Sequence, residues 1–86
     1  MRHATPDDLD QLEGLLAELR ALPELRERTR GSFSRGRRAF LHFHADEDEF
    51  YVDVRLGTAF ERVTVTSDEE RAEFMSRVRG ALRSTV

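Results

Sequence analysis

The sequence contains no cysteine, lysine, tryptophan, asparagine or isoleucine. Without cysteine, the chain can form neither a disulfide framework nor a metal site with thiolate ligands. It also lacks an apolar run near the roughly 20 residues that span a bilayer, and its N-terminus has no hydrophobic stretch of a signal peptide. We therefore expect a soluble, cytoplasmic protein.

Charge is unevenly distributed along the chain. Because lysine is absent, all 14 basic residues are arginine, and 17 acidic residues give a formal net charge of −3. Arginine in place of lysine is typical of GC-rich codon usage, so this excess does not by itself indicate nucleic-acid binding. Arginines gather between residues 26 and 38, whereas residues 46–49 are all acidic.

The 86 residues predict a single domain, residues 1–86, with a modest hydrophobic core that dimerisation would help to stabilise. Thr5 and Pro6 are typical of a helix start, and Pro23 predicts that this helix ends near Ala21. Its expected buried stripe consists of Leu9, Leu12, Leu15, Leu16, Leu19 and Leu22.

Strand signals follow this helix. The clearest predicted strands cover 40–45 and 50–56, with another over 61–66 and a short one near 31–34. Ser67 and Glu70 form a capping box that predicts a second helix, whose buried stripe would be Phe74, Met75, Val78 and Leu82. The expected fold is therefore α+β, in the order α-β-β-β-β-α, with a four-stranded antiparallel sheet and both helices on one face.

The hairpin of residues 40–56 is predicted to have one apolar and one polar face, because side chains alternate along a strand. A four-residue loop at 46–49 would set His42 opposite Asp53 and His44 opposite Tyr51. A two-residue loop would instead set His42 opposite Tyr51 and His44 opposite Glu49. In either register the polar face would gather the candidate ligand-binding residues His42, His44, Tyr51, Asp53, Arg55 and Arg62.

Several functions fit this face. His42 and His44 form an H-x-H pair that could bind zinc, with Asp53 or Glu49 as a third ligand. Arg55 and Arg62 could bind an anion, or the face could be a solvated network of salt bridges. Phe40 and Phe60 are predicted to lie on the same face, and such aromatic surface favours an interface and hence a homodimer.

The leading hypothesis is a non-enzymatic binding module that uses the exposed sheet face. No catalytic residue is assigned, because no nucleophile motif, phosphate loop or pair of catalytic carboxylates is recognisable. One alternative is a metal- or ligand-dependent enzyme that uses His42, His44 and Asp53. The other is nucleic-acid binding by a basic turn, through Arg35, Arg37 and Arg38.

Two short patterns carry a family resemblance. Leu22-Pro23-Glu24-Leu25, Phe33 and Gly36-Arg37-Arg38-Ala39-Phe40 resemble the YjbR-like family, small α+β proteins whose fold is described as a double wing. His42-Phe43-His44-Ala45-Asp46, followed by Asp53-Val54, is similar to a stretch of small bacterial proteins labelled "luciferase domain". The resemblance implies a fold and a shape like that of DNA-binding proteins, and it carries over no catalytic residue. Arg55 stands where the YjbR-like pattern normally has lysine.

Overall fold

The fold was analysed in a computed structural model that describes residues 1–83. In chain order the elements are β1 Arg2–His3, α1 Pro6–Gln11, α2 Glu13–Arg20, β2 Leu25–Thr29, β3 Ser32–Arg35, β4 Arg38–Asp46, β5 Glu49–Val54, β6 Glu61–Thr64 and α3 Asp68–Arg83. The strands form one antiparallel sheet in the order β2-β3-β4-β5-β6, and β1 pairs with β4 as well. The α+β class and the antiparallel sheet are confirmed, whereas the predicted count of four strands and the predicted order α-β-β-β-β-α are wrong.

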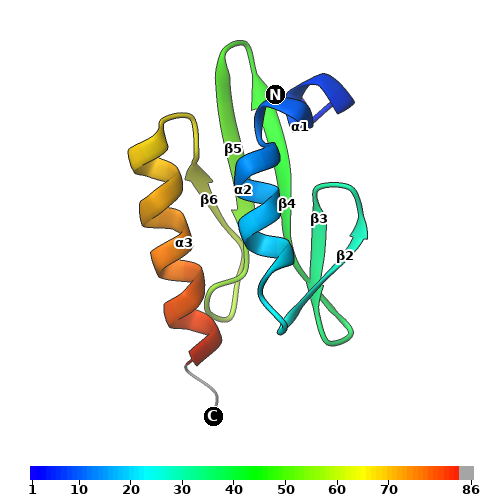
Figure 1. Cartoon of the computed structure of the whole chain (residues 1–86), viewed down its shortest axis with the longest axis vertical. Helices are drawn as coiled ribbons and strands as arrows, with labels where there is room; N and C mark the ends of the chain where they lie inside the picture. The colour runs from blue at the N-terminus through cyan, green and yellow to red at the C-terminus, as the bar shows by residue number, and fades with distance from the viewer. Residues whose placement is uncertain (84–86) are drawn as a thin grey trace.

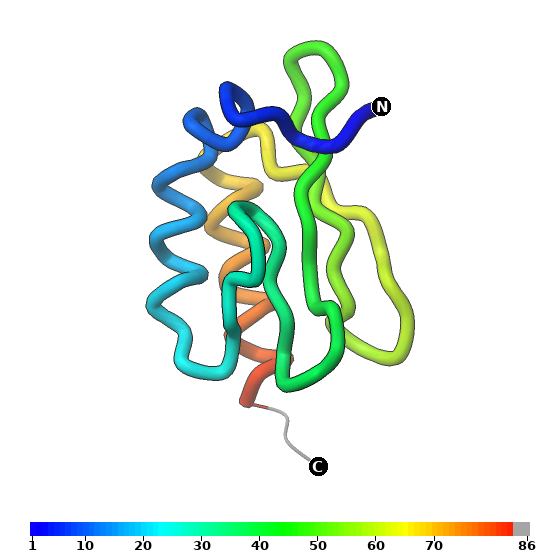
Figure 2. The backbone as a smooth tube through the Cα atoms, turned by 90° about the vertical axis from the view of Figure 1, so that its right-hand side faces the viewer, coloured from blue at the N-terminus to red at the C-terminus, as the bar shows by residue number. Residues whose placement is uncertain are grey.

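The molecule has two layers. Helices α2 and α3 lie side by side on one face of the sheet (Figure 1). Turned by 90°, the tube shows the helices on one side and the strands on the other, and no helix of residues 1–83 covers the second sheet face (Figure 2). None of these helices is both long and apolar enough to cross a membrane.

The two additional strands have weak sequence signals. β2 has the sequence LRERT, in which only Leu25 is buried, so it shows no apolar alternation. β1 consists of two exposed residues, which are too few for a pattern. Both strands form because the neighbouring strands offer free backbone groups for pairing, a tertiary effect that local composition does not encode.

The first helix begins as predicted but is interrupted. Thr5 caps α1, and Thr5 and Asp8 complete a capping box. Leu12 then adopts φ −99° and ψ 7°, which separates α1 from α2. The leucine stripe still faces the core, and α2 ends at Arg20, next to the predicted Ala21.

Helix α3 agrees with its prediction. The Ser67 hydroxyl accepts a hydrogen bond from the Glu70 backbone N–H, and the Glu70 carboxylate accepts one from the Ser67 N–H. The buried residues of α3 are Phe74, Met75, Val78 and Leu82.

A bulge in β4 changes the position of Phe40. Phe33 pairs with Leu41, whereas Ser34 pairs with Ala39, so Phe40 is an extra residue with no partner on β3. Phe40 and Leu41 are consecutive, yet they are only 3% and 1% exposed and both belong to the hydrophobic core. The prediction that Phe40 offers exposed aromatic surface beside the histidines is therefore wrong. It assumed regular alternation along the strand, which the bulge interrupts.

The hairpin formed by β2 and β3 is attached to the helices by ion pairs. Arg20 of α2 contacts Glu27 of β2, with 2.6 Å between Nε and Oε1. Arg30, in the turn of the hairpin, contacts Asp10 at 2.7 Å and Glu13 at 2.9 Å. We call these five residues the arginine–carboxylate network.

Candidate functional site

The register of β4 and β5 places the predicted polar residues together. His42 pairs with Asp53, His44 with Tyr51, and Asp53 with Arg62 of β6. This is the first of the two predicted registers. The turn itself is tighter than predicted, because Asp46 and Glu49 also pair and leave only residues 47 and 48 between them.

Asp53 lies at the centre of this arrangement. Its Oδ2 atom is 2.9 Å from His44 Nε2 and 3.5 Å from His42 Nε2. Arg62 donates two hydrogen bonds to the same carboxylate, Nε to Oδ1 at 2.8 Å and Nη2 to Oδ2 at 2.9 Å. One carboxylate oxygen is thus close to two imidazole nitrogens and one guanidinium nitrogen.

His44 Nε2 has no hydrogen-bond partner within residues 1–83, although it is buried. Its 2.9 Å contact with Asp53 Oδ2 is an ion-pair distance, but the geometry is not that of a hydrogen bond. A buried polar atom left unsatisfied costs about 1–3 kcal/mol. A cation that accepts the nitrogen lone pair would remove this cost.

A third histidine, which sequence reasoning missed, lies beside the first two. His3 of β1 pairs with His44 across the strands. Its ring centroid is 4.8 Å from that of His44 and 6.2 Å from that of His42. Nothing in the sequence indicated this position, since β1 has no strand pattern. We call His3, His42, His44 and Asp53 the His–Asp cluster.

The surroundings of His42 and Asp53 favour the forms of these two side chains that bind metal. Burial lowers the pKa of His42, and the neighbouring His44 lowers it further. The hydrogen bonds from Arg62 are the main reason why the pKa of Asp53 is lowered. At neutral pH, His42 is therefore a neutral imidazole with a free lone pair, and Asp53 is a carboxylate.

The distances are compatible with a shared ion. The ligand atoms of His42, His44 and Asp53 all lie within 4.8 Å of one another. In a tetrahedral zinc site with bonds of about 2.0–2.1 Å, neighbouring ligand atoms are about 3.4 Å apart. Small rotations of the two imidazoles would therefore bring the three atoms around one ion.

The other predicted residues lie outside the His–Asp cluster. Tyr51 is half-buried and adjoins His44 through the strand register. Arg55 forms no ion pair within residues 1–83, and its guanidinium carbon lies 4.6 Å from the centroid of the Phe60 ring. Phe60 is 41% exposed, as predicted, and its ring centroid is 5.9 Å from that of His42.

Comparison of the chain with protein-family models, curated proteins and solved structures found no match. The resemblance to YjbR-like proteins therefore stays a prediction. The function has to be argued from the site itself.

Proposed function

We propose that this chain is a small binding module whose uncovered sheet face holds a divalent transition-metal ion. His42, His44 and Asp53 are the proposed protein ligands, and His3 is placed to supply a fourth. Two or three imidazole nitrogens with one carboxylate oxygen form a donor set that zinc favours.

The buried, unpartnered Nε2 atom of His44 is the observation that carries this proposal. A salt-bridged surface would be expected to give this nitrogen a hydrogen bond or leave it in solvent. Its position 2.9 Å from Asp53 Oδ2 is an ion-pair distance, and the same two atoms can serve together with His42 as ligands of one ion.

Arg62 has a defined part in this proposal. Because it binds both oxygens of Asp53, it fixes the orientation of the carboxylate, as partners of metal ligands commonly do. Its charge also repels a cation. Binding should therefore be favourable but moderate, as suits an ion that is acquired and released.

Metal binding is tested by isothermal titration of EDTA-treated protein with zinc at neutral pH. We expect one ion per chain, with affinity reduced at least about tenfold in each of the variants H42A, H44A and D53N. T64A is the matched control, because Thr64 lies on the neighbouring strand and pairs with Tyr51 rather than with the cluster. It should bind zinc like the parent protein.

The imidazole nitrogens give a second readout. The chain has only three histidines, so their ¹⁵N resonances can be assigned individually. We expect the Nε2 signals of His42 and His44 to shift on addition of zinc, and a shift of His3 would identify the fourth ligand. If zinc does not saturate, or if H44A binds it unchanged, the proposal is wrong.

A further inference from the structure

A small hollow lies at the end of the sheet where β3 turns into β4. Its volume is about 140 Å³, and its lining comes from β3, the start of β4 and the segment after β5. Pockets for drug-sized ligands occupy roughly 300–1,000 Å³, so this hollow fits a small molecule or one terminal group of a larger one. The lining residues are Arg35, Arg38, Ala39, Phe40, Arg55, Leu56 and Gly57.

The charge of this hollow is entirely positive. Arg35, Arg38 and Arg55 line it, and no carboxylate does. In residues 1–83 these three arginines have no ion-pair partner, whereas six other arginines contact a carboxylate. Three guanidinium groups around one hollow repel each other, and a bound anion would offset this repulsion.

Arg55 adds a second observation. Its Nε atom is buried and has no hydrogen-bond partner in the described part of the chain. The Phe60 ring, 4.6 Å from its guanidinium carbon, holds this side chain by a cation–π contact. An N–H donor is thus fixed in place without an acceptor.

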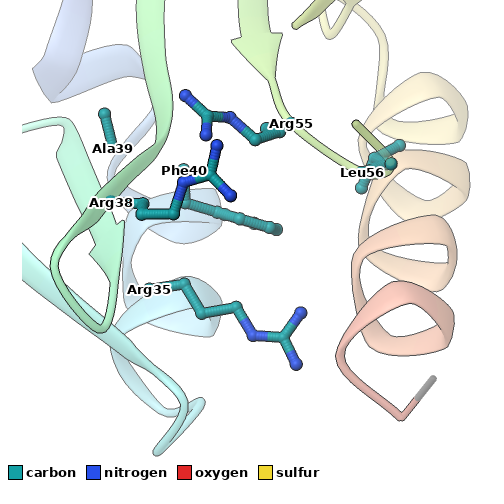
Figure 3. A pocket seen from close by; sticks show the side chains of 7 residues that line it. Arg35, Arg38, Ala39, Phe40, Arg55 and Leu56 are labelled. Carbon is teal, nitrogen blue, oxygen red and sulfur yellow. The ribbon is translucent and has the colours of Figure 1, made fainter. Parts of the chain in front are cut away.

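The floor of the hollow is apolar. Phe40 is buried, and Leu56 is half-buried. In Figure 3 the Phe40 ring lies between Arg35 on one side and Arg38 and Arg55 on the other. Because Phe40 is only 3% exposed, the apolar surface that the hollow offers beside its cationic donors comes mainly from Leu56.

We propose that this hollow is a binding site for a phosphate monoester, with the phosphate at the guanidinium groups of Arg38 and Arg55, Arg35 on the other side of Phe40, and the organic part against Leu56. Arginine donates paired, charge-assisted hydrogen bonds to phosphate oxygens. A monoester carries close to two negative charges at neutral pH. It therefore offsets the positive charge of the lining arginines better than a ligand with a single carboxylate would. The site is separate from the His–Asp cluster and uses none of its residues.

The proposal is tested by titrating the protein with phenyl phosphate, inorganic phosphate and sodium sulfate at matched ionic strength. EDTA is present throughout, so that a metal ion at the His–Asp cluster cannot capture the phosphate. We expect saturable 1:1 binding, tightest for phenyl phosphate. If phenyl phosphate and sulfate bind equally, the apolar floor has no role and the proposal is wrong.

Three arginine variants locate the site. R38A should weaken phenyl phosphate binding about tenfold, which corresponds to the loss of one charge-assisted hydrogen bond, and R35A, on the other side of Phe40, should weaken it less. R37A is the matched control, because Arg37 lies in the same turn, is exposed and does not line the hollow. Circular dichroism checks that all three variants are folded, and R35K and R38K should restore part of the binding. Equal losses in R37A and R38A would show diffuse charge attraction instead of a site.

Duplex DNA serves as the competing ligand, because two of the lining arginines, Arg35 and Arg38, were candidates for nucleic-acid contacts. The proposed site predicts that DNA binds no more tightly than inorganic phosphate. Tight, salt-dependent DNA binding that R37A weakens as much as R38A would replace the monoester site with a phosphate-backbone surface. Zinc binding should be unchanged in R38A, so failure of either proposal can be recognised independently of the other.

Discussion

Phe40 and Phe60 form a natural pair for testing the fold. Simple alternation places both on the uncovered sheet face, whereas the structure leaves Phe60 41% exposed and buries Phe40 to 3% exposure at the bulge of β4. Truncating each residue to alanine should therefore have very different consequences.

The magnitudes follow from this burial. Replacing a buried phenylalanine with alanine typically costs about 3–5 kcal/mol, because apolar contacts are lost and a cavity remains. A domain of this size has a total stability of about 4–13 kcal/mol, so F40A should lose a large part of it. At about 4–8 °C per kcal/mol, the melting temperature should fall by at least about 12 °C. F60A loses the contacts of an exposed ring with Arg55 and His42 and should cost about 1 kcal/mol or less.

The assay is urea unfolding followed by circular dichroism, with the midpoint and slope fitted for each variant. F40L is the second variant at this position in case F40A does not fold, and it should cost about 1–2 kcal/mol. If F40A and F60A lose the same stability to within about 1 kcal/mol, Phe40 is not a core residue. Phe40 would then again be a candidate, with Phe60, for the aromatic surface of a dimer.

Three further predictions concern the remainder of the fold and the oligomeric state. The pKa of Asp8 is lowered mainly by the hydrogen bond from the Thr5 backbone N–H. The stabilisation by Asp8 is therefore present above the unfolded pKa of about 3.9 and is lost as the pH falls through the lower folded pKa. D8N should be about 1 kcal/mol less stable at pH 7 and should lose less stability on acidification, and parallel curves of stability against pH for the two proteins would contradict this. G31A should be more destabilising than G36A in the same unfolding assay, because both glycines have positive φ, of 82° and 62°, but only at Gly31 would a Cβ approach Leu9 Cδ2 to 2.7 Å. Sedimentation equilibrium should detect a dimer in the parent protein that F60A weakens, and a monomer at high micromolar concentration would remove the dimer hypothesis.

The face of the hairpin that carries the His–Asp cluster could be predicted because alternation is a local property. Between residues 41 and 54 no bulge occurs, so each side chain lies on the side that its position indicates. Matching apolar residues across the two strands left two registers open, and the pairing of His42 with Asp53 is one of them. The same reasoning failed at Phe40, one residue outside this stretch, where a bulge defined by pairing with β3 shifts the alternation.

His3 could not be predicted for a different reason. Its place beside His44 depends on a two-residue strand that forms only because β4 is long enough to pair with β1 as well as with β3. Arg55 shows the same limit, since alternation placed it on the face of Asp53 but could not show that Phe60 would hold it elsewhere. A contact between distant segments decides the position of His3, whereas that of Arg55 is decided by Phe60 across the turn of residues 55–60.

The arginine–carboxylate network makes the attachment of β2 to the helices sensitive to salt. β2 buries a single residue, so the attraction between Arg20, Arg30 and their acidic partners supplies much of its attachment to the helices. Salt screens the attraction between exposed charges, with a Debye length of about 10 Å at 0.1 M, whereas it leaves apolar contacts intact. β2 is thus an edge strand whose attachment added salt would weaken, and its release would free the backbone groups of β3 to pair with another chain.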